Sequence, residues 1–252
     1  MTAPFFLVAP DALTSTVGGT VVVDGAEGRH AATVKRLERG EHVLVGDGAG
    51  RVVDGVVTAV LGRDRVEVEV TSYAVHPEPA PRVTVVQALA KGERGDLSVE
   101  LLTEVGVDVV VPWSAARSIA QWRGEKAERG VDRWRTTARE AAKQSRRPFV
   151  PEIRALAATD DAVALVRELV SGGGTAVVLH EAASLRMAAL RVPRSGDVVL
   201  IVGPEGGISD EERAAFESAG ALSARLGPSV LRTSTAGAVA AAVVLASCGR
   251  WD

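Results

Sequence analysis

Residues 1–74 carry short, valine-rich apolar runs separated by turn signals. Residues 66–70, Val-Glu-Val-Glu-Val, alternate apolar and acidic side chains, as a strand with one buried face does. Asp-Gly and Glu-Gly pairs between the runs favour tight turns. The pattern predicts a small all-β domain, a barrel or a sandwich, with one helical turn at residues 30–37. The expected strands are Thr20–Val23, His42–Val45, Arg51–Val60 and Arg65–Val70.

The proline-rich segment at residues 76–81 is typical of a semi-rigid linker. The pattern of apolar and polar residues changes after it. Beyond it, apolar runs of strand length alternate with segments of helical period. Such alternation predicts a mainly parallel sheet covered by helices on both faces, an α/β fold. The expected domains are therefore 1–74 and 83–252, with a linker at 75–82. The expected strands lie at 83–90, 107–111, 176–179, 198–202 and before 227, and the helices at 96–105, 126–144, 160–170, after 209 and after 233.

Two glycine-proline loops each follow an expected strand of this sheet. One is Gly-Pro-Glu-Gly-Gly at residues 203–207; the other begins at Gly227-Pro228 and leads into the alanine-rich helix. Ligands of parallel sheets bind beyond the carboxyl ends of the strands. The loops therefore predict two walls of one small-molecule site. Residues 179–181, Leu-His-Glu, end a third strand at the same edge.

The first loop has an alternative interpretation as an ordinary strand-to-helix turn. Ser209 and Glu212 have the spacing of a capping box, which starts a helix. A G-x-G-x-x-G fingerprint and a P-loop lysine are both absent, which weakens the dehydrogenase and nucleoside-triphosphatase interpretations. The glycines alone do not decide between a turn and a ligand site.

Basic residues are concentrated in one stretch of a chain whose net charge is −3. Residues 117–147 hold ten basic and four acidic side chains. The helix at 126–144 places apolar residues on one stripe and Arg135, Arg139, Lys143 and Arg146 on an adjacent flank. Like charges at this spacing repel each other, and phosphate oxygens would relieve them. A solvated helix face and an RNA contact remain equally open.

The composition argues against disulfide-bonded, metal-binding, secreted and membrane proteins. The single cysteine, Cys248, excludes an internal disulfide and a cysteine-cluster metal site, as is usual in a reducing cytoplasm. The four histidines have no metal-binding spacing, so no metal is expected. The amino terminus lacks the features of a secretory signal, and no apolar run has the length of a membrane span. A cytoplasmic protein is expected.

Taken together, these motifs resemble the RsmE family of ribosomal RNA methyltransferases, and the resemblance runs nearly end to end. The signature segments are Gly203–Gly207 and Leu226–Thr233. The segments that also match are Val34–Leu37, Lys91-Gly92, Thr103–Val107, Arg117-Ser118, Glu140-Ala141 and Gln144–Arg147.

The resemblance implies a PUA-like β-barrel that binds RNA, followed by a SPOUT methyltransferase domain with a trefoil knot. It implies transfer of a methyl group from S-adenosylmethionine to N3 of a uridine in 16S rRNA of the small ribosomal subunit. It also implies a homodimer with each active site at the subunit interface.

The resemblance implies the cofactor-binding residues, and the chemistry of the implied reaction and the basic flank suggest the catalytic and RNA-binding ones. Arg232 is the candidate for stabilising negative charge on the uracil, and Glu205 is either a general base or a holder of its loop. The expected cofactor-binding residues are Leu179, His180, Glu181, Val202, Gly203, Pro204, Gly206, Gly207, Leu226, Gly227, Val230 and Leu231. The expected RNA-binding residues are Arg117, Arg135, Arg139, Lys143, Gln144, Arg146 and Arg147.

Two positions depart from the family pattern. Ser234 stands where the family commonly has a glutamate, and Ala3-Pro4 stands where many members have a basic residue. These departures leave open a catalytically silent RNA-binding protein of the same fold. A methyltransferase of a different rRNA base and a reductase with a nucleotide cofactor also stay open.

Overall fold

The computed structural model describes residues 3–192 and 196–251. Contacts divide the chain into two compact units, one of Met1–Glu78 with Ala142–Val150 and the other of Pro79–Ala141 with Pro151–Asp252. The chain therefore leaves the first unit and comes back to it at residues 142–150. The domains expected from the sequence, 1–74 and 83–252 with a linker at 75–82, do not include this return. The return depends on hydrogen bonds between distant segments: Val150 N–H donates to Gly48 O over 2.9 Å, and Gly50 N–H donates to Pro148 O over 3.0 Å.

The first unit is built on a five-stranded sheet with the order β1-β3-β4-β5-β2. Its strands are β1 Phe5–Leu7, β2 Thr20–Val23, β3 His42–Gly46, β4 Arg51–Leu61 and β5 Arg65–Val75. The pairings among β2 to β5 are antiparallel, and β1 adds a parallel pair with β3. A short helix, α1 Gly25–Arg29, continues into a π-helical turn, His30–Val34.

One apolar core fills this unit. Val66, Val68 and Val70 are buried, as their alternation with glutamates predicts. They meet valines of the other long strands and Phe6 from β1 in one cluster. The all-β expectation is confirmed, and the helical turn expected at residues 30–37 is found in part, as the π-helical turn His30–Val34. The sequence missed β1 because three residues are too few to show a period.

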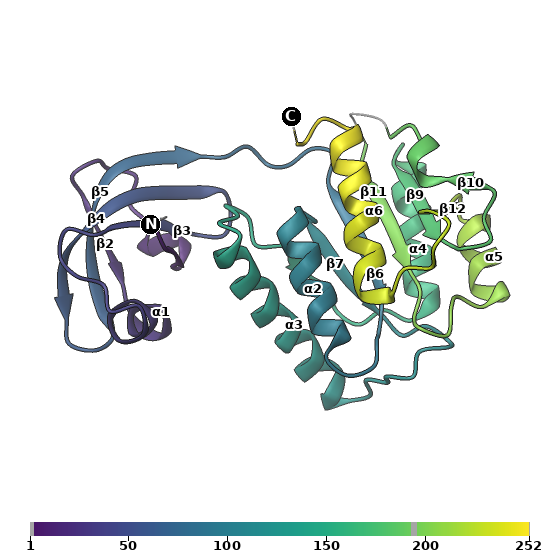
Figure 1. The fold of residues 1–252 in the computed structure, drawn as a ribbon, viewed down its shortest axis with the longest axis horizontal. Helices are drawn as coiled ribbons and strands as arrows, with labels where there is room; N and C mark the ends of the chain where they lie inside the picture. The colour runs from purple at the N-terminus through teal and green to yellow at the C-terminus, as the bar shows by residue number, and fades with distance from the viewer. Residues whose placement is uncertain (1–2, 193–195, 252) are drawn as a thin grey trace. The chain divides into compact units, whose positions relative to one another are not determined.

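The second unit is a seven-stranded sheet with the order β10-β12-β9-β11-β6-β7-β8 (Figure 1), and every pairing in it is parallel. This confirms the α/β expectation. The strands are β6 Val83–Ala88, β7 Val109–Trp113, β8 Glu152–Ile153, β9 Thr175–Leu179, β10 Leu185–Arg186, β11 Val198–Val202 and β12 Leu222–Arg225.

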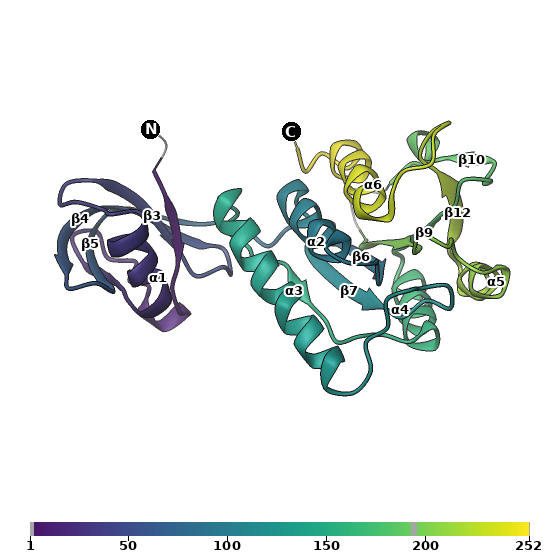
Figure 2. The ribbon, with the colours of Figure 1, turned by 60° about the horizontal axis from the view of Figure 1, so that its bottom comes forward.

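Helices cover both faces of this sheet. Helices α2 Arg94–Val105 and α6 Thr233–Ser247 pack against each other, and α6 also lies on β6 and β11. Figures 1 and 2 both show α2 beside α6. Side chains of α4 Thr159–Ser171 and α5 Asp210–Ser218 share a separate core cluster with the sheet. The remaining long helix is α3 Glu125–Gln144.

The strand order places β9, β11 and β6 at the centre of the sheet. The chain reaches β11 after β10 and then passes to β12 on the far side of β9 before α6 returns to β6. Because β9 and β11 are neighbours, the loops that follow them emerge side by side at one edge.

Three strand predictions in this unit need correction. The two-residue edge strands β8 and β10 carry no period and were missed. Strand β7 continues through Pro112 to Trp113 instead of ending at the proline. It can do so because Pro112 uses its carbonyl, which accepts from Ala157 N–H over 2.8 Å. No helix among the described residues is long and apolar enough to cross a membrane.

Candidate functional site

A pocket of about 490 Å³ opens where β9 and β11 end. Its walls are residues 179–181 after β9, residues 202–208 around the first glycine-proline loop, and residues 230–233 at the start of α6. A smaller pocket of about 80 Å³ shares Leu179, His180 and Glu181 with it. Leu226 and Gly227 line this smaller pocket. The structure thus brings together all twelve sequence-predicted cofactor residues, along with Glu205, Arg232 and Arg117.

The first glycine-proline loop is closely packed. A Cβ added to Gly203 would lie 2.6 Å from Ile208 Cγ1, and one added to Gly206 would lie 3.1 Å from Arg117 Cβ. Gly207 has a φ of 75°, which favours glycine. The packing and the backbone conformation of this loop therefore both require glycine, whether or not a ligand is bound.

A capping box ends this loop, as the sequence predicts. Glu212 N–H donates to Ser209 Oγ over 3.2 Å, and Ser209 N–H donates to Glu212 Oε2 over 3.1 Å. The other oxygen of the buried Glu212 carboxylate accepts from Ala116 N–H and from the Thr159 hydroxyl. One carboxylate thus fixes the loop, the start of α5 and the segment that carries Arg117.

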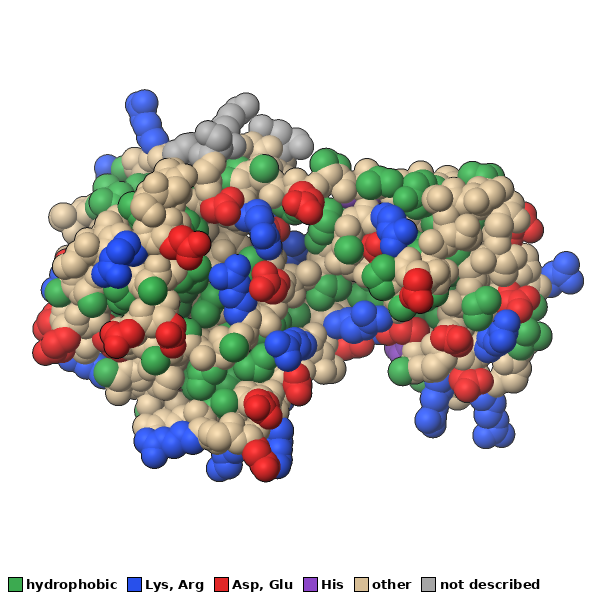
Figure 3. Space-filling model, turned by 180° about the vertical axis from the view of Figure 1, so that it is seen from behind, with side chains coloured by type: hydrophobic (Ala, Val, Ile, Leu, Met, Phe, Trp, Pro, Cys, Tyr) green, Lys and Arg blue, Asp and Glu red, His purple; other side chains and the backbone are tan. Residues whose placement is uncertain are grey.

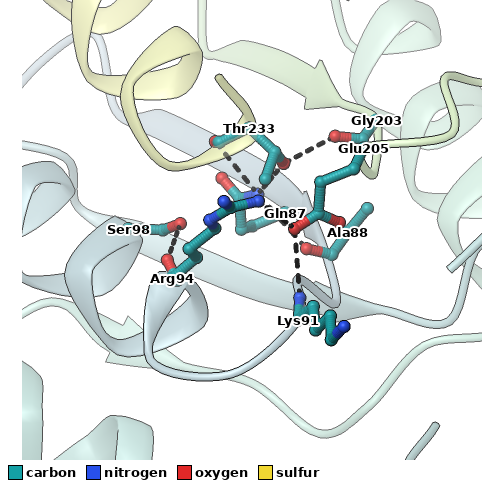
Figure 4. A network of polar contacts seen from close by, with 8 residues as sticks. All are labelled: Gln87, Ala88, Lys91, Arg94, Ser98, Gly203, Glu205 and Thr233. Carbon is teal, nitrogen blue, oxygen red and sulfur yellow. Dashed lines mark hydrogen bonds and ion pairs between the residues drawn. The ribbon is translucent and has the colours of Figure 1, made fainter. Parts of the chain in front are cut away.

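Glu205 is held from the opposite side (Figure 4). Its Oε1 accepts from Lys91 N–H over 3.2 Å and from Arg94 Nη1 over 3.3 Å. The Glu205 side chain is 22% exposed and that of Arg94 is 48% exposed. This arrangement is that of a loop anchor. Sequence reasoning missed Arg94, which lines the pocket, because its partner lies far away in the chain.

Three arginines stand around the pocket: Arg94, Arg117 and Arg232. Arg117 Nη1 donates to Gly206 O over 3.4 Å. Arg232 is the extended residue that precedes α6, so its exposed side chain starts from a fixed backbone position. Positive charge at the mouth of a pocket favours an anionic substrate such as RNA.

The pKa of the Glu217 carboxyl, which lies near His180, is lowered by its neighbours. The Ser223 hydroxyl donates to Glu217 over 2.6 Å and is the main cause that lowers the pKa of this carboxyl. Burial opposes the shift, while Arg213 and the charge of His180 reinforce it. Glu217 therefore stays ionised to lower pH, and its negative charge acts on His180, the residue that follows β9.

The predicted RNA-binding flank is not a row of equivalent cations. Lys143 Nζ lies 2.8 Å from Glu27 Oε1, and the Lys143 side chain is 9% exposed. Arg135 pairs with Asp132 at 2.8 Å, as its spacing suggests. Contacts also divide the set: Arg135 and Arg139 belong to the second unit, and Lys143, Gln144, Arg146 and Arg147 to the first.

The positive charge of Lys143 is therefore balanced within the protein, by a carboxylate of the distant helix α1. Arg146 is exposed, with a φ of 54° that places it beyond the helix end. On the face that Figure 3 shows, Lys and Arg side chains are interspersed with Asp and Glu. Within the described ranges, no group of three or more His, Cys, Asp or Glu side chains could hold a metal ion.

Two family models match the chain. An RNA methyltransferase domain model matches residues 76–245, and an RNA methyltransferase PUA domain model matches residues 23–71. The first match covers most of the second unit, including the pocket, and the second falls within the sheet of the first unit.

Named relatives agree with these models. The chain is 46% identical over 252 residues to ribosomal RNA small subunit methyltransferase E of Mycobacterium bovis, covering all of this chain and 95% of that protein. A crystal structure of the Neisseria gonorrhoeae enzyme of the same name, bound to S-adenosylmethionine, aligns with a TM-score of 0.84 at 26% identity and covers 97% of this chain and 98% of that one. A methyltransferase from Legionella pneumophila, also in complex with S-adenosylmethionine, aligns with a TM-score of 0.83 at 26% identity, covering 98% of each chain. The chain belongs to the ribosomal RNA small subunit methyltransferase E family, the RsmE family that its motifs resemble.

Proposed function

We propose that this protein transfers a methyl group from S-adenosylmethionine to N3 of a uridine in 16S rRNA of the small ribosomal subunit. The observation that carries the proposal is the pocket at the ends of β9 and β11, where loops from three separate segments meet. Its position matches the ligand site expected of a parallel sheet. The family supplies the reaction class.

The residues of the pocket fit this cofactor. Leu179, Val202 and Val230 offer apolar surface for an adenine ring. The glycine loop exposes backbone donors and acceptors without side chains in front of them. Glu181 and Asp210 supply negative charge near the positively charged sulfonium and amino groups. We propose the twelve residues named from the sequence as the cofactor-binding set.

The cofactor supplies an activated methyl group, so the protein's task is alignment and stabilisation of charge. Uridine N3 carries a proton at neutral pH, and negative charge develops on the uracil ring as this proton leaves. Arg232, beside the pocket and unobstructed by packing, is placed to stabilise that charge. Glu205 holds the loop against Lys91 and Arg94, and we assign it this role in preference to that of general base.

Contact with RNA extends beyond the pocket. Arg117 lines the site itself, so we assign it to the target nucleotide or its phosphate. Gln144 and Arg146 are exposed and are proposed as RNA contacts of the first unit. Arg135, Arg139 and Arg147 remain in the proposed set. Lys143 acts through its ion pair with Glu27, which fixes the segment that carries Arg146.

We further propose that the protein forms a homodimer that completes the active site. Exposed apolar side chains around the pocket and on α6 support this: Val230 is 77% exposed and Val239 is 42% exposed. Apolar side chains at such a position are typical of a surface that a partner covers. Light scattering should give twice the chain mass.

A reverse-transcription stop assay tests the function directly. A methyl group on uridine N3 blocks base pairing, so small subunits treated with the protein and S-adenosylmethionine should stop the polymerase at one position. Omission of the cofactor is the control. Cofactor binding without any stop would contradict uridine-N3 methylation and favour a different base. Absence of cofactor binding would favour the catalytically silent RNA-binding protein that Ser234 suggests.

A further inference from the structure

Gln87 is a fully buried amide side chain in a strand whose other residues, apart from Thr84, are apolar. Every residue of β6 is buried, and Gln87 is 0% exposed. Burial of an amide is unfavourable unless its donors and acceptors are paired. Gln87 Oε1 has no hydrogen-bond partner among the described residues. A side chain of this kind weakens the core, so its contacts suggest a role other than stability.

Those contacts lead from β6 to two of the three walls of the pocket, the first glycine-proline loop and the start of α6 (Figure 4). Gln87 Nε2 donates to Thr233 Oγ1 over 3.1 Å and to Ala88 O over 3.2 Å. Thr233 Oγ1 in turn donates to Gly203 O over 2.6 Å. A hydroxyl has one proton to donate. Because Gly203 O takes that proton, the hydroxyl must accept from position 87, and the amide NH2 of Gln87 supplies the donor that a carboxylate could not.

The two ends of this chain of hydrogen bonds are parts of the site. Gly203 begins the first glycine-proline loop, and Thr233 directly follows Arg232 at the start of α6. Both residues line the pocket, whereas Gln87 lies beneath it and does not. The Thr233 hydroxyl, oriented by the buried amide, therefore links these two walls directly.

Packing around Gln87 leaves little freedom for this arrangement. A Cβ added to Gly237 of α6 would lie 3.1 Å from Leu102 Cδ2, 3.2 Å from Val202 Cγ2 and 3.4 Å from Gln87 Oε1. Helix α6 thus approaches the sheet closely at the turn after Thr233. The amide is confined between α6 and β11, so it holds Thr233 in one position.

We infer that Gln87 is a positioning residue, which orients the Thr233 hydroxyl and so fixes the first glycine-proline loop against Arg232. The inference deepens the proposed function, since the pocket that it shapes is the proposed cofactor site. Gln87 touches neither cofactor nor substrate, and its effect passes through Thr233.

Replacement of Gln87 by methionine tests the inference by separating affinity from stability. In Gln87→Met the dissociation constant for S-adenosylmethionine, measured by calorimetry, should rise about tenfold, the effect of one lost hydrogen bond. The melting temperature of the cofactor-free protein should not fall, because an unpaired buried oxygen is removed as well. An unchanged dissociation constant, or a melting temperature that falls together with affinity, would overturn the inference.

Variants of Thr233 give a second, independent measurement. Thr233→Val removes the hydroxyl and should weaken cofactor binding, while Thr233→Ser keeps it and should restore binding. The double variant with Gln87→Met should bind no more weakly than Thr233→Val alone, because both changes break one chain. Additive losses would contradict the inference. Thr103→Val is the matched control: its hydroxyl donates within α2, so affinity should stay unchanged.

The same experiments distinguish this inference from the function on which it rests. A wild-type protein that binds no S-adenosylmethionine contradicts the proposed function, and the inference fails with it. A wild-type protein that binds the cofactor, with a Gln87→Met variant that binds equally well, contradicts the inference alone.

Discussion

At Gly203, in the loop that follows β11, an added Cβ would lie 2.6 Å from Ile208 Cγ1; at Gly227, in the loop that follows β12, it would meet nothing within 4 Å. The first loop is also bonded on every side, through Gly203 O, Glu205, Gly206 O and Ser209. The part of the chain that the structure describes supplies no hydrogen bond to residues 226–231.

The two loops therefore form one pocket by different means. The first is preorganised by the packing of its own chain, so its glycines are explained before any ligand binds. In the second loop, Val230 is 77% exposed and Leu231 is 37% exposed, and the packing of the chain itself does not explain why apolar residues stand there. We infer that the first loop supplies a fixed wall and that the second becomes ordered against cofactor, RNA or a second subunit. Substitutions in the two loops test this difference.

The largest effect is expected at Arg232, at the end of the second loop. Arg232→Ala should fold and bind cofactor but lose about 100-fold to 1,000-fold in the rate of methyl transfer, as removal of a charge-stabilising donor does. Single-turnover kinetics with saturating cofactor measure this step. Arg167→Ala, an exposed arginine of α4, is the control and should keep the full rate. Near-normal turnover of Arg232→Ala would remove this residue from the mechanism.

Replacement by alanine should destabilise the protein at Gly203 and have little effect at Gly227. Gly203→Ala forces a methyl group against Ile208 and should lower the free energy of unfolding by about 1–3 kcal/mol. Gly227→Ala points into open space and should change it by less than about 0.5 kcal/mol. Urea denaturation of both variants makes the comparison. Equal losses would show that the second loop is packed as tightly as the first.

The sequence predicted these loops because strand ends and glycines are local features. It could not predict the contacts that hold the first loop, since Arg94 and Glu205 lie 111 residues apart, and Gln87 and Thr233 lie 146 apart. The pairing of Lys143 with Glu27 spans 116 residues and was missed for the same reason. A signal for Gln87 did exist: it is the one amide in a strand-length run that is apolar apart from Thr84.

The capping box at the end of the first loop should show a smaller difference. Ser209→Ala removes the acceptor of Glu212 N–H and should lower the free energy of unfolding by about 1 kcal/mol. Ser229→Ala, in the second loop, alters an exposed side chain and should have no measurable effect. Thermal unfolding followed by circular dichroism measures both. A loss at Ser229 comparable to that at Ser209 would contradict the view that only the first loop is fixed by internal bonds.

Substitution of Val230 should affect ligand binding more than stability, and so tests what orders the second loop. Val230→Ser should change the free energy of unfolding by less than about 0.5 kcal/mol, because the side chain packs against little of its own chain. It should nevertheless weaken cofactor binding about fivefold, because apolar surface that the ligand covers is lost. Val75→Ser, an exposed valine at the end of β5, should change neither quantity. If Val230→Ser binds cofactor normally but lowers the mass measured by light scattering, the second loop is ordered by the partner subunit instead of the ligand.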